Sequence, residues 1–300
     1  MKLLVTGAFK CSNNQLEYLK TLGNEVVFMQ NESDYLPCDY TDIEGIICNG
    51  LFLYHDIKKF VNLKYIQLTS AGFDRVDLDY IKSAGIKIFN ARGVYSIPMA
   101  EYALFGVLSL YKNGKCFYEN QTAKRYEKNR SLLELFGKTV CIVGAGNVGT
   151  ECAKRFRAFG SKVIGVDLFP RDDDNFDKVF SLSSLDEILR VSDVVVLTLP
   201  LDKSTENLFD KDRFNAMKQN SVLVNIARGK IVDEKALLGA LDGKLYGAVI
   251  DVTSVEPLPS DNKLWEKQNV ILTPHNSFVG DGNNQRLFDL VINNLKGELK

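Results

Sequence analysis

Short apolar runs alternate with longer amphipathic stretches along almost the whole chain. This alternation is typical of βαβ units, in which each buried strand is followed by a helix that covers one face of a parallel sheet. A first group of predicted strands covers residues 3–7, 25–29, 45–49, 65–69 and 86–90. A second, more apolar group begins at residue 139 and comprises TVCIVG, KVIGVD, VVVLTLP, VLVNIA, GAVIDV and NVILTPH. The pattern therefore predicts an α/β fold with two sets of strands.

Two helices are predicted at the borders of these groups. Ser96 is expected to cap a helix that runs to about residue 112, with Pro98 in its first turn, and this helix is the expected bridge between domains. A last helix is predicted over residues 284–299, and we expect it to pack against the first domain. Its apolar positions at helical spacing are Leu287, Leu290, Val291 and Leu295.

Composition narrows the class of protein. The 300 residues include 37 basic and 38 acidic side chains, a formal net charge of −1, which argues against a nucleic acid partner. Hydrophobic residues make up 45% and charged residues 25%, as in ordinary globular proteins. At about 150 residues per domain, the length favours two domains. The acidic segments ESDYLPCDYTD and RDDDN are short, and we interpret them as solvated loops.

Nothing in the sequence predicts a membrane anchor or a metal site. The start MKLLVTGAFK lacks the features of a signal peptide, and no apolar stretch approaches the roughly 20 residues that span a bilayer. The six cysteines show no CxxC spacing, and Cys48 and Cys141 lie within apolar runs. We therefore expect reduced thiols and a cytoplasmic location.

A glycine-rich motif opens the second group of strands. Residues 144–149 read GAGNVG, which fits GxGxxG and lies between a predicted strand and a predicted helix. Gly144 would allow a tight turn, Gly146 a close approach to a pyrophosphate, and Gly149 close packing of helix against strand. The helix is expected to bury Cys152, Ala153, Phe156 and Phe159. Strand, turn and helix together predict a dinucleotide site.

An acidic residue ends the next strand. Asp167 lies 18 residues after Gly149, near the spacing of about 20 expected for a carboxylate that binds the ribose of NAD. A 2′-phosphate would meet this negative charge, so NAD is favoured. Arg171 leaves NADP as the less favoured cofactor, and a solvated strand-end acid is the alternative interpretation of Asp167.

Polar residues also end each later strand of this group. Ligands of open parallel sheets bind outside the carboxyl ends of the strands, so these side chains should converge on one crevice. They are Thr198, which lies near Pro200 at the end of its strand, Asn225 and Arg228, Asp251, and His275.

Two residues of this set, together with Glu256, suit acid–base chemistry on an organic acid. His275 follows Pro274 at a strand end, and an imidazole can exchange a proton with a substrate oxygen near neutral pH. Glu256 could orient the ring and favour its charged form. Arg228 offers a planar fork for a carboxylate and a carbonyl oxygen. The alternatives are a structural histidine, and an arginine that binds phosphate or forms a surface salt bridge.

Several segments resemble the D-isomer-specific 2-hydroxyacid dehydrogenases. They are residues 70–78, 90–104, 227–233, 251–257 and 273–275. The resemblance covers nearly the whole chain and implies two Rossmann-like domains, each a parallel sheet flanked by helices, with a cleft between them. It implies a substrate-binding domain of residues 1–94 plus 276–300, an NAD-binding domain of residues 95–275, and a homodimer built largely on the nucleotide domain.

The resemblance also implies roles for individual residues. Arg228 would bind the 2-oxo acid, His275 would act as general acid in its reduction, and Glu256 would pair with His275. Backbone amides of Ala71 and Gly72 would hold the substrate carboxylate. The expected cofactor-binding residues are Gly144, Gly146, Asn147, Val148, Gly149, Asp167, Pro200, Thr205, Asn225, Ala227 and Asp251.

Other features bear on the branch of the family. Formate-oxidising members carry Gln where Glu256 stands, so Glu256 favours hydroxyacid chemistry, and residues 256–265 resemble reductases of glyoxylate, hydroxypyruvate and related acids. In the segment NSFVGDG after His275, this chain departs from the small residues that many members of the family carry there. The alternative function is a dinucleotide-sensing regulatory protein, similar to the corepressors of this family. The physiological hydroxy acid stays open.

Overall fold

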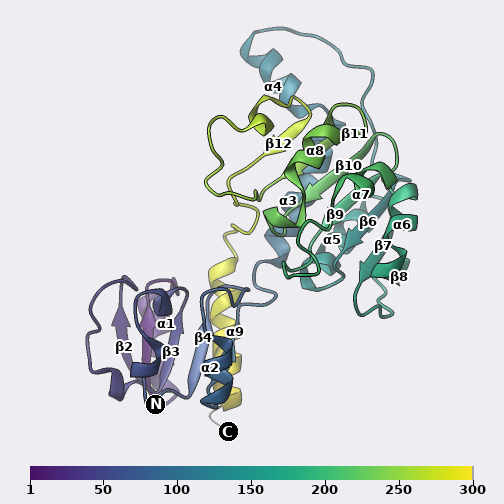
Figure 1. Ribbon diagram of the computed structural model, residues 1–300. Helices are drawn as coiled ribbons and strands as arrows, with labels where there is room; N and C mark the ends of the chain where they lie inside the picture. The colour runs from purple at the N-terminus through teal and green to yellow at the C-terminus, as the bar shows by residue number, and fades with distance from the viewer. Residues whose placement is uncertain (299–300) are drawn as a thin grey trace. The chain divides into compact units, whose positions relative to one another are not determined.

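The computed structural model describes residues 1–298, which form two compact units. The central unit runs from Ser96 to Val279. The N-terminal unit comprises Met1–Tyr95 together with the chain from Gly280 onward. The chain therefore passes between the units twice, and each unit has its own parallel sheet (Figure 1). Residues 276–279 group with the central unit.

The sheet of the N-terminal unit has the order β2-β1-β3-β4-β5, and all of its strand pairs are parallel. Its strands are β1 (Lys2–Thr6), β2 (Glu25–Met29), β3 (Gly45–Cys48), β4 (Tyr65–Leu68) and β5 (Lys87–Phe89). Its helices are α1 (Asn13–Thr21), α2 (Leu78–Ser83) and α9 (Asn283–Glu298).

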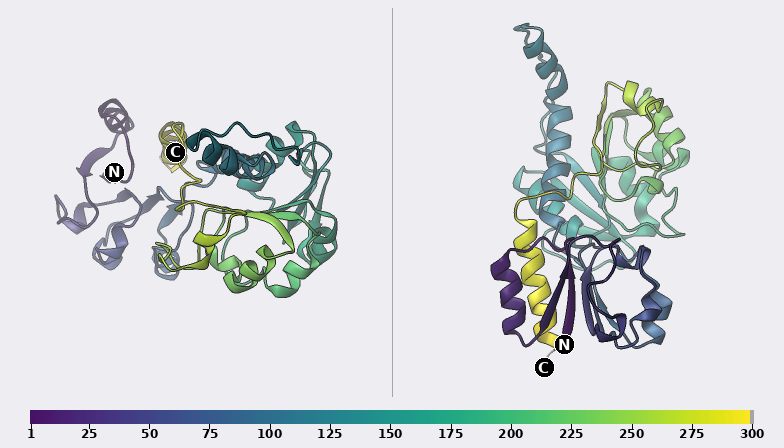
Figure 2. Two further views of the ribbon diagram at one scale, coloured as in Figure 1. Left: turned by 90° about the horizontal axis from the view of Figure 1, so that it is seen from above. Right: turned by 90° about the vertical axis from the view of Figure 1, so that its left-hand side faces the viewer.

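The last helix completes the core of the N-terminal unit. Leu287, Val291 and Leu295 of α9 are buried in the same cluster as Leu3 and Val5 of β1. Figure 2 shows α9 beside the strands of this unit. The prediction that the last helix packs against the first domain is therefore confirmed, and residue 299 of the predicted helix lies outside the described residues.

The sheet of the central unit has the order β12-β11-β10-β9-β6-β7-β8 and is also parallel throughout. Its strands are β6 (Thr139–Val143), β7 (Lys162–Asp167), β8 (Lys178–Ser181), β9 (Val194–Leu197), β10 (Ser221–Asn225), β11 (Leu245–Ile250) and β12 (Val270–Leu272). Its helices are α3 (Ser96–Tyr111), α4 (Gly114–Thr122), α5 (Asn147–Ala158), α6 (Leu185–Val191), α7 (Lys211–Ala216) and α8 (Glu234–Leu241).

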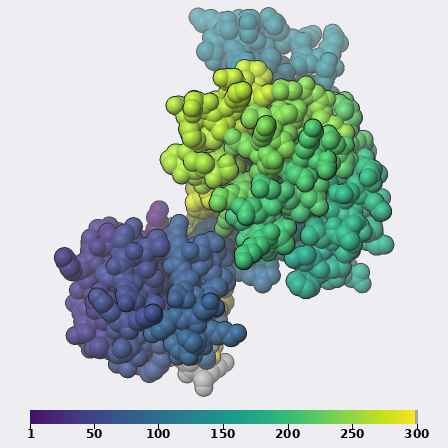
Figure 3. All heavy atoms as spheres, viewed as in Figure 1, coloured from purple at the N-terminus to yellow at the C-terminus, as the bar shows by residue number. Residues whose placement is uncertain are grey.

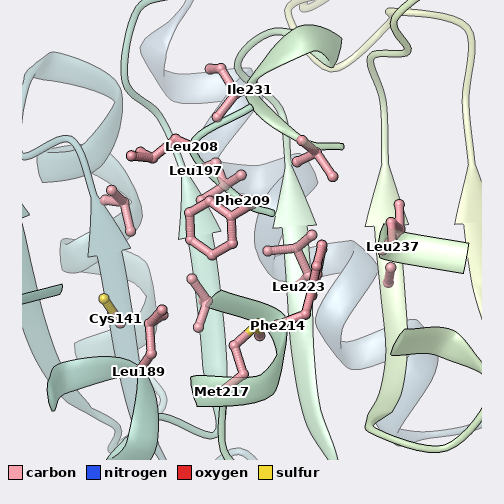
Figure 4. Close-up of a cluster of buried hydrophobic side chains, with 14 of the residues drawn as sticks. Cys141, Leu189, Leu197, Leu208, Phe209, Phe214, Met217, Leu223, Ile231 and Leu237 are labelled. Atoms are coloured by element: carbon pink, nitrogen blue, oxygen red, sulfur yellow. The ribbon is translucent and has the colours of Figure 1, made fainter. Parts of the chain in front are cut away.

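Helices cover both faces of this sheet, as the left view of Figure 2 shows. On one face Phe214 of α7 and Leu237 of α8 pack in a cluster with alternate strand residues (Figure 4). On the other face Ala103 of α3 and Phe156 of α5 pack against the remaining strand residues. Burial on both faces explains why these strands are nearly continuous apolar runs.

The strand order reverses at β6, which lies between β7 and β9. Crossovers leave in opposite directions at such a point, so the loops at the carboxyl ends of the two strands separate and open a place for a ligand. The glycine-rich motif directly follows β6. The topology therefore places this motif where parallel sheets bind their ligands.

The structure corrects several details of the predicted elements. The prediction lacks the strand β8 and the helix α4. The strand β8 was missed because it is a half-buried edge strand with a weak apolar signal. Phe159 is 45% exposed, since α5 ends at Ala158 before reaching it. Glu32 does not belong to a solvated loop, because its carboxylate accepts hydrogen bonds from Thr6 Oγ1 and the Gly50 amide.

The described residues include no helix with the length and apolar character that would be needed to cross a bilayer.

Candidate active site

The turn after β6 requires glycine at its first position. Gly144 has a φ of +103°, and a Cβ there would lie 2.7 Å from the amide nitrogen of Leu199. Thr198 Oγ1 donates to Gly144 O at 2.6 Å, which holds the loop after β9 against this turn. Any side chain at Gly144 would therefore push these two loops apart.

The other two glycines of the motif differ in their surroundings. A Cβ on Gly149 would lie 2.1 Å from Gly144 O, so helix α5 packs directly on the turn. A Cβ on Gly146 would meet nothing within 4 Å, so the space beside its backbone is open. The N-terminus of α5 has no side-chain cap and no acidic residue in its first turn. Its free N–H groups suit an anion, and the turn fits the pyrophosphate of a dinucleotide.

Asp167 ends β7 and lies against the same turn. Its Oδ2 accepts from the Ala145 amide at 2.7 Å, and its Oδ1 accepts from the Phe169 amide at 3.0 Å. Arg171 Nη2 donates to Ala145 O at 2.7 Å. The structure thus places both predicted determinants of cofactor choice beside the glycine-rich turn, and their roles toward a ribose stay predictions.

Other predicted cofactor residues shape the loops around the turn. The Thr205 hydroxyl donates to Pro200 O at 2.8 Å and accepts from the Asp202 amide at 2.7 Å. The Asn225 side chain donates to Arg228 O at 3.0 Å and accepts from the Ala227 amide at 3.1 Å. Thr205 and Asn225 are both buried, so these contacts fix loop shape, and their contact with a cofactor stays a prediction.

The three predicted catalytic residues follow neighbouring strands. Arg228 follows β10, Glu256 follows β11 and His275 follows β12, so all three lie at the carboxyl edge of one sheet. Gly229 brings the first two loops into backbone contact, because a Cβ on it would lie 2.0 Å from the Thr253 carbonyl. The loops after β10, β11 and β12 therefore lie next to one another at the carboxyl edge of the sheet, in the same order as in the sequence.

Glu256 and His275 form a direct pair. Nδ1 of His275 lies 2.8 Å from Glu256 Oε2, and the other carboxylate oxygen of Glu256 accepts from the Thr253 amide at 3.0 Å. The two side chains are 41% and 39% exposed. Within residues 1–298, Nε2 of His275 makes no hydrogen bond. The carboxylate fixes one ring nitrogen and leaves the other available.

Arg228 keeps donors free for a ligand. Its Nη1 donates to Ala227 O at 2.7 Å, which bends the side chain back along its own loop. In the described part of the chain, no carboxylate forms an ion pair with Arg228. The partly exposed guanidinium can therefore receive an organic carboxylate.

Ala71 and Gly72 lie in the N-terminal unit, after β4. Their carbonyls are occupied: Asn90 Nδ2 donates to Ala71 O at 2.6 Å, and Ser70 Oγ donates to Gly72 O at 3.1 Å. No acceptor is assigned to either amide among residues 1–298. Two amides on one turn suit a carboxylate, and their role toward a substrate stays a prediction.

Asp251 has a structural task that its sequence context did not reveal. Its side chain is buried, and both carboxylate oxygens accept hydrogen bonds from residues 273–277, the segment that carries His275. Gly229 and Tyr102, which hold neighbouring loops, were not predicted from the sequence. The ARG segment was a signal for Gly229, whereas Tyr102 lies in a helix whose apolar face predicts only core.

The chain is similar in sequence and in fold to known proteins. A family model described as "D-isomer specific 2-hydroxyacid dehydrogenase, NAD binding domain" matches residues 104–277. A glyoxylate reductase from Thermofilum pendens is 34% identical over 80% of this chain and 73% of its own. A D-3-phosphoglycerate dehydrogenase from Methanocaldococcus jannaschii is 35% identical over 73% of this chain and 42% of its own.

A solved structure agrees over nearly the full length. The D-lactate dehydrogenase from Aquifex aeolicus, complexed with NAD and lactic acid, has a TM-score of 0.78 and 27% identity, covering 99% of this chain and 95% of that chain. The fold and these similarities define a nicotinamide-dependent oxidoreductase with a Rossmann fold. The chain belongs to the D-isomer specific 2-hydroxyacid dehydrogenase family. Its cofactor is NAD(H) and its reaction class is oxidoreduction of D-2-hydroxy acids.

Proposed function

We propose that this dehydrogenase interconverts a small 2-oxo acid and its D-2-hydroxy acid, with His275 as general acid and base. The observation that carries this proposal is the His275–Glu256 pair, in which Nδ1 and Oε2 lie 2.8 Å apart. Both side chains are partly exposed, at the same carboxyl edge of the sheet as Arg228. A histidine with one nitrogen held by a carboxylate and the other free has the arrangement needed for proton transfer.

The cofactor would be held by the turn after β6. The Gly146 backbone and the N-terminus of α5 would take the pyrophosphate, and Asp167 would take the adenosine ribose. Bound NADH supplies the hydride that reduces C2 of the oxo acid. The protein's own part is to hold the acid, orient it and move the proton.

Four groups of the chain would serve the reaction, three of them in contact with the substrate. The Arg228 fork would bind the carboxylate and polarise the oxo oxygen, and the amides of Ala71 and Gly72 are proposed as further donors to a substrate carboxylate. Nε2 of His275 would donate the proton to the oxygen on C2. Glu256 would keep Nδ1 protonated and stabilise the imidazolium before the transfer.

The direct test follows NADH absorbance with purified protein and a panel of 2-oxo acids: pyruvate, glyoxylate, hydroxypyruvate, 2-oxoisocaproate, phenylpyruvate and oxaloacetate. We expect one acid to give a clearly higher kcat/KM than the others, which would define the side chain that the site accepts. If none of these acids is reduced although NADH still binds, the proposal is contradicted and a dinucleotide-sensing regulatory protein is favoured.

A homodimer is part of the proposal. The helices α3 and α4 carry a groove with an apolar lining, and α4 projects beyond the rest of the central unit (Figure 3). Phe105 and Tyr118 in this lining are 56% and 72% exposed. Exposed apolar surface of this kind supports contact with a second copy of the chain. Its apolar lining residues are Leu104, Phe105, Leu108, Phe117, Tyr118 and Leu132.

A cytoplasmic location is also proposed. All six cysteines are free thiols, and Cys48, Cys141 and Cys152 are buried. Persistent free thiols are typical of a reducing compartment. Cell fractionation with an antibody against the chain would test this, and recovery in an extracytoplasmic fraction would contradict it.

A further inference from the structure

A buried carboxylate organises the segment that carries His275. Oδ1 of Asp251 accepts from Thr273 Oγ1 at 2.7 Å and from the Asn276 amide at 2.8 Å, and Oδ2 accepts from the Ser277 amide at 2.9 Å. The His275 amide donates to the main-chain oxygen of Asp251 at 2.7 Å. The side chain of Asp251 therefore holds the residues before and after His275, and its main-chain oxygen holds the His275 amide.

The hydroxyl of Thr273 is itself held by Tyr102. A hydroxyl has a single proton, and Thr273 donates its proton to Asp251 Oδ1. The Tyr102 hydroxyl therefore donates to Thr273 Oγ1, at 2.6 Å. Burial raises the pKa of Tyr102, which keeps it a protonated donor. In this series of hydrogen bonds, Tyr102 donates to Thr273 and Thr273 donates to Asp251. Because all donors point the same way, each hydrogen bond strengthens the next.

The backbone of His275 needs such support. Its φ is +51°, in the left-handed region that side chains other than glycine seldom occupy. A residue keeps this conformation only where its surroundings determine it. If the segment loosens, the backbone can relax toward negative φ, and the ring would then leave the position in which Nδ1 meets Glu256.

We propose that Tyr102 of α3 is a positioning residue for His275, acting through Thr273 and Asp251. Tyr102 itself contacts neither the histidine ring nor Glu256 by a hydrogen bond in the described chain. The inference rests on the proposed function in one respect, namely that His275 is the proton donor. Removal of the Tyr102 hydroxyl should therefore reduce turnover while the cofactor turn after β6 stays intact.

The first experiment compares two Tyr→Phe substitutions on the same helix. Tyr102→Phe should lower kcat about threefold to tenfold, the effect of one lost hydrogen bond, with the Kd for NADH within about twofold of the parent's. Tyr111→Phe removes a buried hydroxyl that lies outside this hydrogen-bond chain, and kcat should be unchanged. An equal fall in both variants would overturn the proposal, because it would indicate general loosening of α3.

The second experiment tests the route through Thr273. Thr273→Val removes the hydroxyl and should lower kcat at least as much as Tyr102→Phe, whereas Thr273→Ser keeps the hydroxyl and should restore most of the activity. Addition of Tyr102→Phe to Thr273→Val should change kcat by less than about twofold, since the two residues act in one chain. Effects that multiply in the double variant would contradict the proposed route.

A third readout does not depend on activity. The chain has two histidines, so a protein labelled with ¹³C at histidine Cε1 gives two ring signals by NMR. His55 lies in the N-terminal unit, where its ring forms hydrogen bonds with the Tyr40 hydroxyl and with Glu32 O. It serves as an internal reference. Tyr102→Phe should shift the His275 signal alone, and Tyr111→Phe should shift neither.

The NMR readout separates the two hypotheses. A shifted His275 signal in a protein that reduces no 2-oxo acid would support the positioning role and refute the proposed function. An unshifted signal with unchanged kcat in Tyr102→Phe would refute the positioning role and leave the proposed function standing.

Discussion

His275 combines an unusual backbone with a defined ring partner. Its φ of +51° and its 2.8 Å contact with Glu256 both require the loops after β11 and β12 to keep their shape. A general acid must present its proton within hydrogen-bond reach of the substrate oxygen. The strain at this residue is therefore consistent with a side chain placed for chemistry.

Replacement of this residue gives the first prediction. His275→Ala removes the proton donor and should lower kcat by about 10²-fold or more. The residues that would bind the cofactor belong to other loops, so the Kd for NADH from fluorescence titration should stay within about threefold of the parent's. Turnover equal to the parent's would show that another group donates the proton.

Asp167 gives the second prediction at the residue scale. Its carboxylate faces the glycine-rich turn, where a 2′-phosphate would meet a negative charge. The kcat/KM with NADPH should therefore be at least about tenfold below that with NADH, and Asp167→Asn should narrow the gap. Equal values for the two cofactors in the parent protein would exclude this role of Asp167.

Sequence alone could predict part of this site. Glu256 and His275 lie in segments typical of the family, and the structure brings them together. Tyr102 could not be predicted, because its contact with Thr273 joins residues 171 positions apart and depends on how α3 packs on the sheet. The hydrogen bonds of Asp251 were hidden for the same reason.

At the scale of elements, the contact between α5 and the turn after β6 is the tightest constraint on the cofactor site. The helix approaches so closely that a Cβ on Gly149 would overlap Gly144 O. The direction of α5 sets where its N-terminal amides point, and these amides are the proposed anion site. A small change in packing should therefore affect binding directly.

Gly149→Ala is the third prediction. The new methyl group would lie 2.1 Å from Gly144 O, so α5 must shift, and we expect loss of NADH affinity by at least about tenfold together with about 2 kcal/mol of stability. Gly239→Ala in α8 is the control, because its Cβ meets nothing within 4 Å. The control should keep its affinity and gain up to about 1 kcal/mol. Normal NADH binding by Gly149→Ala would disprove the constraint.

The pattern of apolar runs predicted the buried strands better than the surface elements. Strands such as β9 and β10 are covered on both faces, so their sequences are continuous apolar runs. The edge strand β8 is only partly buried along its length, and in α4 only Asn120 is buried, so neither element has a clear apolar period. Burial thus determined which elements the sequence could reveal.

At the scale of the whole molecule, the exposed apolar groove on α3 and α4 gives the fourth prediction. Phe105→Glu places a charge in this groove and should shift the protein from dimer to monomer in sedimentation experiments. Tyr35→Glu is the control, because Tyr35 is fully exposed in the N-terminal unit. A parent protein that sediments as a monomer would refute the dimer.

The two passages of the chain between its units have a consequence for synthesis on the ribosome. The N-terminal unit needs Leu287 and Val291 of α9 to cover the side of the sheet where Leu3 and Val5 lie. The ribosome delivers the entire central unit before it delivers α9, at about 5–20 residues per second. The N-terminal unit is therefore translated before the central unit but completes its core only after it, and its apolar face must stay protected until α9 has been synthesised.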